Sequence, residues 1–184
     1  TSGRVMYIGL DLGTSGLKGV LMGEDQVVLA EATAPLTVQR PAEGWSEQAP
    51  SDWISAAEAV LDQLSSKGLG QVRGIGLSGH MHGATLLDKG DEVLRPCILW
   101  NDTRSHVEAA ALDVDPKFRR LTGNLVFPGF TAPKLVWVRH HEPAIWDRVA
   151  KVLLPKDYLR LWLTGEHVGE MSDAAGTGWL ETGR

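Results

Sequence analysis

Two apolar runs near the start of the chain, separated by a short turn, constrain the fold more than any other feature. Val5–Leu10 and Leu17–Met22 are rich in large or β-branched apolar residues, and DLGTSG between them holds two glycines and two hydroxyl side chains. Such runs are typical of strands, and the residues between them are typical of a turn. A third apolar run, Val27–Ala34, follows GEDQ, so the sequence predicts three strands in a meander.

The next region predicts a helix and then a return to the sheet. Ser51–Leu64 places its apolar residues on one helical stripe, with Ser51 as the expected N-cap. Val72–Ser78 has strand composition, and ATLLD and CILW are predicted to be further short strands. A strand reached through a helix predicts a mixed α/β sheet. Helices are expected to dominate the remainder, in TRSHVEAAAL and over 116–121, 132–141, 143–148 and 156–163.

The composition narrows the environment and the partners. The chain has 184 residues, of which 43% are hydrophobic, enough for one compact domain or lobe. Its net charge of -5 argues against nucleic acid as a partner, because phosphate backbones are bound by clustered lysine and arginine. With one cysteine, Cys97, and no apolar stretch of about 20 residues, we expect no membrane span and a reducing, cytoplasmic location. Residues 1–5 are interpreted as an expression scar, which leaves 6–184 as one lobe.

The turn between the first two strands carries the chemistry that phosphates require. Inward-facing backbone N–H groups and hydroxyls bind phosphate oxygens, and a carboxylate holds Mg²⁺ or its waters. Asp11 at the end of a buried strand is costly without a partner or a metal. The stretch DLGTSGLK matches neither the G-x-x-x-x-G-K-[ST] nor the G-x-G-x-x-G phosphate pattern. The alternative interpretation is a hairpin that uses glycine and serine only for its turn.

Several stretches of the chain resemble one family. DLGTSGLK resembles the first phosphate motif of the actin, Hsp70 and sugar-kinase superfamily. The stretches GWSEQAP, GLSGHMHGATLLD, ILWNDTR, FTAPKLVWV and LLPKDYLRLWLTGE resemble the FGGY carbohydrate kinases. The resemblance covers Met6–Trp179 and implies a ribonuclease H-like lobe, a mixed five-stranded sheet flanked by helices.

The resemblance also implies an activity and its site. SGHMHGA is most similar to the members that phosphorylate xylulose, because glycerol-phosphorylating members carry Arg-Glu in place of Met81-His82. This implies ATP-dependent phosphorylation of D-xylulose at its terminal hydroxyl, with ATP and Mg²⁺. The implied residues for phosphate and Mg²⁺ are Asp11 (to the metal, through water), Gly13, Thr14, Ser15 and Lys18, and those for the sugar are Met81, His82, Trp100, Asn101 and Asp102.

Other polar residues have plainer interpretations beside the functional ones. His80 and His82 lack a third ligand at a convincing spacing for a metal site, and Asp102 could cap the helix that follows it. Trp45 and Glu47 are interpreted as packing residues. Lys134 and Trp137 are interpreted as part of an amphipathic core helix. We assign no chemistry to Lys156, Asp157 and Asp173.

The family pattern also predicts what this chain does not carry. The catalytic base and the adenine-binding segment are expected in a second, C-terminal lobe, so no catalytic residue is assigned here and the isolated chain is expected to be inactive. The expected partners are a small ketose and the chain's own C-terminal lobe, and a homodimer is left open. Two alternatives remain: a kinase for ribulose or another ketose, and a non-catalytic sugar-binding or interaction lobe.

Overall fold

The computed structural model describes residues 5–182 and divides them into two compact units. The first unit comprises 5–37 and 51–80, and the second comprises 38–50 and 81–182. Four of the five residues interpreted as an expression scar lie outside the described residues. Each unit is described by itself below.

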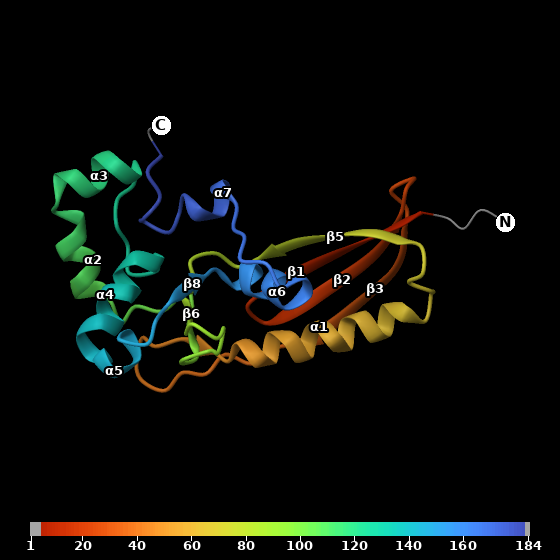
Figure 1. The fold of residues 1–184 in the computed structure, drawn as a ribbon, viewed down its shortest axis with the longest axis horizontal. Helices are drawn as coiled ribbons and strands as arrows, with labels where there is room; N and C mark the ends of the chain where they lie inside the picture. Colours follow the sequence, from red (N-terminus) through yellow and green to blue (C-terminus); the bar gives the residue numbers. More distant parts are fainter. Residues whose placement is uncertain (1–4, 183–184) are drawn as a thin grey trace. The chain divides into compact units, whose positions relative to one another are not determined.

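The first unit contains a four-stranded mixed sheet (Figure 1). Its strands β1 (Met6–Leu12), β2 (Gly16–Gly23) and β3 (Val28–Pro35) form the predicted antiparallel meander. β5 (Val72–Gly79) then pairs with β1 in parallel, which gives the order β3-β2-β1-β5. The predicted meander and the mixed sheet are therefore confirmed.

The prediction of five strands in this sheet is wrong for the described residues, because two predicted strands pair elsewhere. ATLLD contains β6 (Thr85–Leu87), which pairs with β8 (Lys151–Leu153), and CILW contains β7 (Cys97–Ile98), which pairs with β4 (Glu47–Gln48). Both pairs are antiparallel and lie in the second unit. Every residue of β6 and β7 is buried, so these short runs lack the alternation that would indicate a partner or a face.

Helix α1 (Pro50–Ser65) covers one face of the four-stranded sheet, as Figure 1 shows. The predicted stripe is confirmed, since Trp53, Val60 and Leu64 are fully buried. The helix begins at Pro50, one residue before the expected cap, because proline is well suited to the first helical turn. Gly19 on β2 allows the close approach, because a Cβ there would lie 2.3 Å from Val60 Cγ1.

The strand alternation places the polar residues on the opposite face of the sheet. On β1, Ile8 and Leu10 are buried, whereas Tyr7 and Asp11 are exposed. Because successive side chains of a strand point to opposite faces, Asp11 points away from the face that α1 covers. Its cross-strand neighbour Lys18 on β2 shares that face. The open face of the sheet therefore carries the predicted phosphate residues of β1 and β2.

The second unit is mainly helical and confirms the predicted helices. They are α2 (His106–Asp113), α3 (Pro116–Thr122), α4 (Thr131–His141), α5 (Pro143–Trp146) and α6 (Pro155–Thr164), followed by the unpredicted α7 (Met171–Ala174). A core cluster of Ala84, Leu86, Ile98, Trp137 and Val138 joins the short strands to α4.

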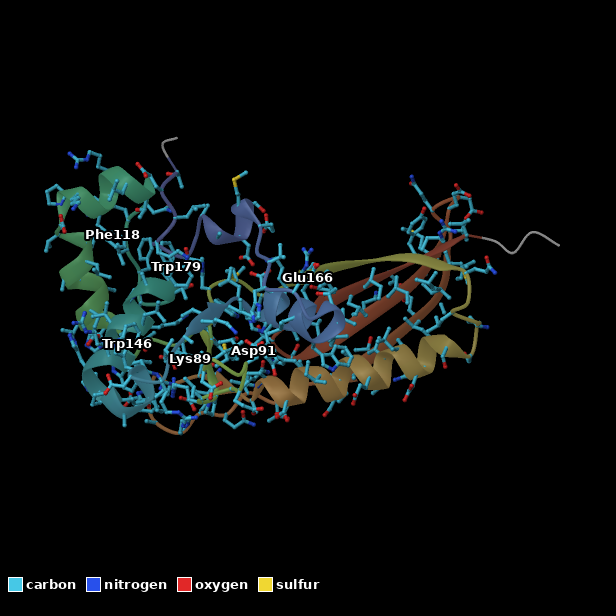
Figure 2. The ribbon with its side chains drawn as sticks, in the orientation of Figure 1. Lys89, Asp91, Phe118, Trp146, Glu166 and Trp179 are labelled. Carbon is cyan, nitrogen blue, oxygen red and sulfur yellow. The ribbon has the colours of Figure 1, made fainter. Side chains whose placement is uncertain are left out.

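Two contacts fix the outer parts of the second unit. Phe118 on α3 lies beside Gly178, where a Cβ would be 3.4 Å from the Phe118 ring. Figure 2 shows Phe118 and Trp179, the residue after Gly178, in the same part of the second unit. Asp91 accepts hydrogen bonds from Lys151 Nζ and from His167 Nε2, the latter at 2.7 Å.

Among the described residues, no helix has the length and apolarity needed to span a bilayer.

Candidate active site

The loop between β1 and β2 is a tight turn that only glycine permits at two places. The Gly13 amide donates to the Gly16 carbonyl at 3.0 Å, and a Cβ on Gly13 would lie 3.0 Å from that same oxygen. A Cβ on Gly16 would lie 3.0 Å from the Ala34 carbonyl oxygen. The two glycines therefore allow backbone to pack against backbone, while Thr14 and Ser15 form the tip between them.

Asp11 stands at the mouth of this loop with a single protein partner. Ser78 Oγ on the neighbouring strand β5 donates to Asp11 Oδ1 at 2.7 Å, and Oδ2 makes no hydrogen bond within the described part of the chain. The carboxylate is exposed on the open face of the sheet. Asp11 thus has acceptor capacity left for a ligand, and Ser78 is a site residue that sequence reasoning missed.

Lys18 lies beside Asp11 and makes an exposed ion pair. Asp11 and Lys18 are paired across β1 and β2, and Lys18 Nζ is 3.2 Å from Glu31 Oε1 on β3. A groove of about 300 Å³ runs over this face and is lined by Asp11, Lys18 and Ser78 together with the small residues Gly9 and Gly76. The structure therefore brings together the five residues predicted for phosphate and Mg²⁺ in one unit.

These residues fit a magnesium–phosphate group. The described residues contain no cluster of three or more histidine, cysteine or acidic side chains that could hold a metal. Mg²⁺ is usually held by one or two carboxylates, waters and substrate phosphates rather than by a protein cage. One exposed carboxylate beside a glycine-hydroxyl turn matches that pattern, whereas a structural zinc or calcium site would need more protein ligands.

Met81 and His82 form a tight turn after β5, in the second unit. His82 has a left-handed backbone with φ of 65°, and the Gly83 amide donates to the Met81 carbonyl at 2.8 Å across it. A hydrogen bond from residue i+2 to residue i around a central residue of positive φ is a classic γ-turn, which is rare and strained. Met81 is 45% exposed at this turn.

The His82 imidazole contacts two segments of the second unit, one at Phe130 and one at Gly176. Its ring centroid is 4.8 Å from that of Phe130, and a Cβ on Gly176 would lie 2.5 Å from His82 Cε1. Burial lowers the pKa of His82, and the nearby Lys134 lowers it further. A neutral imidazole at pH 7 can donate from one nitrogen and accept at the other, which suits a sugar hydroxyl.

Trp100 and Asn101 adjoin the same region through Gly129. A Cβ on Gly129 would lie 2.5 Å from the Trp100 carbonyl oxygen, so the 127–130 segment packs directly on this backbone. The Trp100 side chain is 42% exposed. Asn101 is half-buried, and its Oδ1 has no hydrogen-bond partner among the described residues. The Asn101 oxygen is itself buried, so it is an acceptor with unused capacity for a hydrogen bond.

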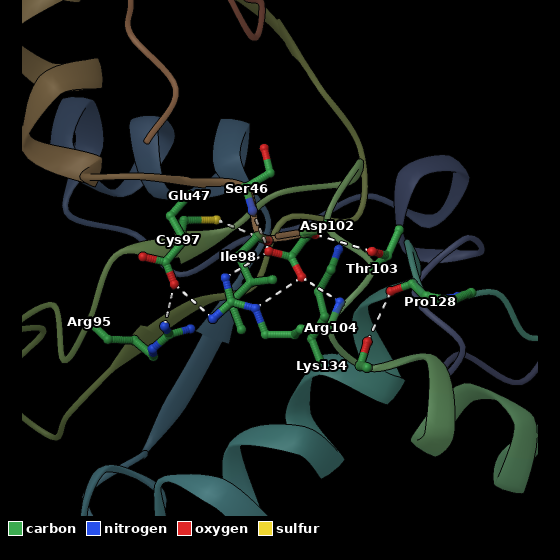
Figure 3. Close-up of polar contacts among 12 residues, drawn as sticks. Ser46, Glu47, Arg95, Cys97, Ile98, Asp102, Thr103, Arg104, Pro128 and Lys134 are labelled. Atoms are coloured by element: carbon green, nitrogen blue, oxygen red, sulfur yellow. Dashed lines mark hydrogen bonds and ion pairs between the residues drawn. The ribbon is translucent and has the colours of Figure 1, made fainter. Parts of the chain in front are cut away.

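Asp102 differs from its two neighbours because it is only 1% exposed. Its carboxylate accepts from the Ser46 amide and from Arg104, whose Nε and Nη2 bind it at 2.9 and 2.7 Å (Figure 3). It does not cap the next helix, because the N-cap of α2 is Ser105. Sugar contact by Asp102 stays a prediction, and the buried geometry favours a role in holding the loop.

Asp102 belongs to a buried charge network that the sequence did not indicate. Arg104 Nη1 is 2.8 Å from Glu47 Oε1, and Arg95 Nη2 is 2.6 Å from the same oxygen. Arg95 Nε is also 2.8 Å from Glu142 Oε2. Trp45 stacks under the Arg104 guanidinium at 3.7 Å, so the interpretation of Trp45 and Glu47 as packing residues agrees with the structure.

Lys134 on α4 is fully buried, which the interpretation as an ordinary amphipathic residue did not anticipate. Its Nζ donates to the His82 carbonyl at 3.0 Å and to the Gly129 carbonyl at 2.6 Å. Thr131, also fully buried, donates from Oγ1 to the same His82 carbonyl at 3.0 Å. Their spacing of three on one helix was the only signal in the sequence that could have linked them.

Lys156, Asp157 and Asp173 form a separate ion cluster. Lys156 Nζ lies 3.0 Å from Asp157 Oδ1 and 2.8 Å from Asp173 Oδ2. Burial raises the pKa of Asp157, and the acidic neighbours Asp173 and Glu170 act in the same direction. The cluster ties α6 to α7.

Comparison with known proteins agrees with the resemblance in the motifs. Residues 6–183 match the model of the N-terminal domain of the FGGY family of carbohydrate kinases. The chain is 55% identical over 181 residues to a xylulose kinase from Klebsiella pneumoniae and 53% identical to one from Escherichia coli strain K12. Each alignment covers 97% of this chain, but the chain spans only 38% and 37% of those relatives.

Solved structures show the same relationship. The crystal structure of a Brucella ovis protein described as a xyloylose kinase has 61% sequence identity and a TM-score of 0.94. That alignment covers 97% of this chain and 38% of the Brucella chain. A xylulose kinase from Rhodospirillum rubrum has 36% identity and a TM-score of 0.89 over 96% of this chain and 38% of the other.

Proposed function

The chain belongs to the FGGY family of carbohydrate kinases, as a match to its N-terminal domain, and from this premise we propose that the protein phosphorylates D-xylulose with ATP. The observation that carries the proposal is the exposed Asp11 carboxylate beside the glycine-hydroxyl turn. The names of the relatives, which are xylulose kinases at 53–55% identity, support the choice of ketose.

The first unit supplies the phosphate side of the reaction. The 13–16 turn would present backbone amides and hydroxyls to phosphate oxygens, and the Asp11 oxygen that Ser78 does not contact would hold Mg²⁺ through its waters. Mg²⁺ neutralises charge on the phosphates when it is bound. Ser78 fixes the rotamer of Asp11, so the carboxylate is preorganised before the nucleotide arrives.

The second unit supplies part of the sugar side. Met81, His82, Trp100 and Asn101 carry an exposed thioether, a neutral imidazole, an indole face and an unused amide oxygen. His82 and Asn101 hydrogen-bond ketose hydroxyls, while Trp100 packs against the carbon skeleton. Asp102 and Arg104 hold the loop that presents Trp100 and Asn101.

The proposed chemistry is an in-line transfer. The terminal hydroxyl oxygen of the ketose forms a bond to the γ-phosphorus, the bond from that phosphorus to the bridging oxygen breaks, and ADP leaves. The hydroxyl proton passes to a base that we place in the C-terminal lobe of the same protein, which also covers the adenine. We further propose that the first unit is a ribonuclease H-like sheet.

The test is a substrate panel on the enzyme with both lobes. A coupled ADP-release assay with Mg-ATP compares xylulose, ribulose and glycerol, and we expect xylulose to have the highest kcat/KM. Asp11→Asn is the matched control for background ATP hydrolysis, because it keeps the size of the side chain. A clear preference for ribulose would replace the substrate, and sugar binding without any turnover would favour a non-catalytic lobe.

The division of labour between the lobes has its own test. The 184-residue chain alone is expected to give no turnover, because aligning the two substrates contributes roughly 7–11 kcal/mol and we place the catalytic base and the adenine contacts in the C-terminal lobe. Turnover by this chain above its Asp11→Asn control would place the catalytic base within it.

A further inference from the structure

We propose that Lys134, together with Thr131, is a positioning residue for ketose phosphorylation that locks the strained His82 turn from beneath. The inference rests on the proposed function, since it assumes that His82 contacts the sugar. Neither residue needs to touch the substrate. Both act through the backbone carbonyl of His82.

The argument begins with the conformation of His82. A non-glycine residue with φ of 65° in a γ-turn stores backbone strain, which persists only when surrounding contacts hold it. The His82 carbonyl accepts two side-chain hydrogen bonds, both at 3.0 Å, from Thr131 Oγ1 and Lys134 Nζ. These two donors fix the direction of the peptide that follows His82, and thereby the direction of its imidazole.

Helix α4 is the rigid base for this lock. Thr131 and Lys134 are three residues apart, so they lie on the same helix face. Both side chains are fully buried, which removes competition from water at the His82 carbonyl. On the same helix Trp137 and Val138 anchor the following turn in the core.

Lys134 also joins the two segments that carry the sugar residues. Its second hydrogen bond goes to the Gly129 carbonyl, and Gly129 packs against the Trp100 backbone. Phe130, the next residue, contacts the His82 ring. A single amino group therefore sets the spacing between the His82 turn and the backbone beside Trp100.

The lock does not depend on the charge of Lys134. Burial lowers the pKa of Lys134 to about 7, so both protonation states are populated near neutral pH. A neutral amine still has two N–H groups, which is the number that the two carbonyl acceptors need. Both hydrogen bonds survive deprotonation.

The first experiment measures steady-state kinetics of Lys134→Met in the enzyme with both lobes. We expect kcat/KM for xylulose to fall about 100-fold, because a displacement of about 1 Å at a reacting group has that effect, while KM for ATP changes less than about twofold. Val138→Ala is the control: it weakens the same helix in the core but contacts neither carbonyl, so it should lower Tm and leave kcat/KM nearly unchanged.

A double-mutant cycle with His82→Ala tests whether Lys134 acts through His82. If it does, Lys134→Met should cost far less in the His82→Ala background than in the wild type. Equal losses in the two backgrounds would overturn the proposal. Thr131→Val removes the second donor and should lower kcat/KM by a smaller factor than Lys134→Met. Thr131→Ser keeps the hydroxyl donor and should retain kcat/KM close to that of the wild type. This pair keeps the test decisive if Lys134→Met does not fold.

A measurement without substrate separates this proposal from the proposed function. Hydrogen exchange of the Gly83 amide reports the γ-turn, and we expect it to accelerate at least tenfold in Lys134→Met relative to Val138→Ala. Unchanged exchange at Gly83 would overturn the lock. Accelerated exchange in an enzyme whose wild type phosphorylates no ketose would instead leave the lock standing and reject the substrate.

Discussion

The two units of the chain hold their charged residues in opposite ways. In the first unit, Asp11 and Lys18 are exposed, and each has one polar side-chain partner on an adjacent strand among the described residues. In the second unit, the charges of Asp102 and Arg104 are buried and fully engaged by other protein groups. An exposed charge with spare capacity can bind a ligand, whereas a saturated buried charge can only hold structure.

The comparison shows that two polar motifs of similar composition can have different roles in one chain. DLGTSGLK and NDTR both combine carboxylates with cations or hydroxyls. In the first motif the protein leaves one carboxylate oxygen without a partner, and in the second it uses both. Mutation of Asp11 should therefore affect catalysis, and mutation of the buried charge network should affect stability; the following predictions test this in order of expected size.

The largest effect is expected in the buried network. Glu47→Gln leaves the guanidinium groups of Arg95 and Arg104 without their shared carboxylate, so the free energy of unfolding should fall by about 3–5 kcal/mol. Urea unfolding followed by tryptophan fluorescence measures the change. A loss below about 1 kcal/mol would break the distinction between the two units.

The next effect concerns catalysis in the first unit. Asp11→Asn should lower kcat by about 100-fold or more, because the carboxylate acts through Mg²⁺ on charge that develops in the transition state. KM for the ketose should hardly change, and Tm should be retained because Asp11 is exposed. Loss confined to the sugar KM, with kcat intact, would contradict this role.

A smaller loss is expected for His82, the residue of the second unit that we propose to contact the sugar. His82→Ala should weaken ketose use by about 1–3 kcal/mol, the cost of leaving a buried group unpaired. Binding of ATP, measured by calorimetry, should be unaffected. Equal damage to nucleotide binding would place His82 outside the sugar site.

The buried lysine should give stability a pH dependence. The folded state lowers the pKa of Lys134 to about 7 from the ordinary 10.5, so between these values the unfolded chain binds more protons. Stability should therefore rise with pH above about 7, by about 1.4 kcal/mol per pH unit, and lose this contribution as pH falls to 7. Denaturation of wild type and Lys134→Met at pH 7 and 9 isolates this difference, and parallel curves would contradict it.

The smallest effect is expected for the exposed ion pair. Glu31→Gln removes the partner of Lys18, and both side chains are about half exposed. Its effect on the free energy of unfolding should stay below about 1 kcal/mol. The same urea experiment makes it the matched control for Glu47→Gln.

Local sequence patterns predicted where the helices and strands lie better than they predicted which strands pair with each other. The meander, α1 and the C-terminal helices follow from apolar periodicity and turn residues, which act over a few positions. The pairing of β7 with β4 and of β6 with β8 does not, because strands of only two or three residues are too short to show an alternation from which a partner or register could be predicted. Their partners are fixed by packing around Trp137 and Val138.

The candidate site divides in the same way. Asp11 and the glycines of its turn were predictable, because their residue types and spacing have a direct chemical meaning. Lys134 and Thr131 were not, because in the sequence they look like any polar residues on an amphipathic helix. Only the fold brings them to the His82 carbonyl, across about 50 residues of chain.

The route of the chain between the two units has a consequence for biosynthesis. Residues 38–50 leave the ribosome before 51–80, yet they belong with 81–182. β4 therefore cannot pair until β7 has been synthesised, and Glu47 cannot form its ion pairs until Arg95 and Arg104 have been synthesised. By then β5 can already have completed the four-stranded sheet, with α1 packed on it. Once residues up to about 80 have emerged from the ribosome, that sheet can form while the 38–50 segment still lacks its partners from 81–182, so a pause in translation before Cys97 emerges would prolong the exposure of this segment to chaperones and proteases.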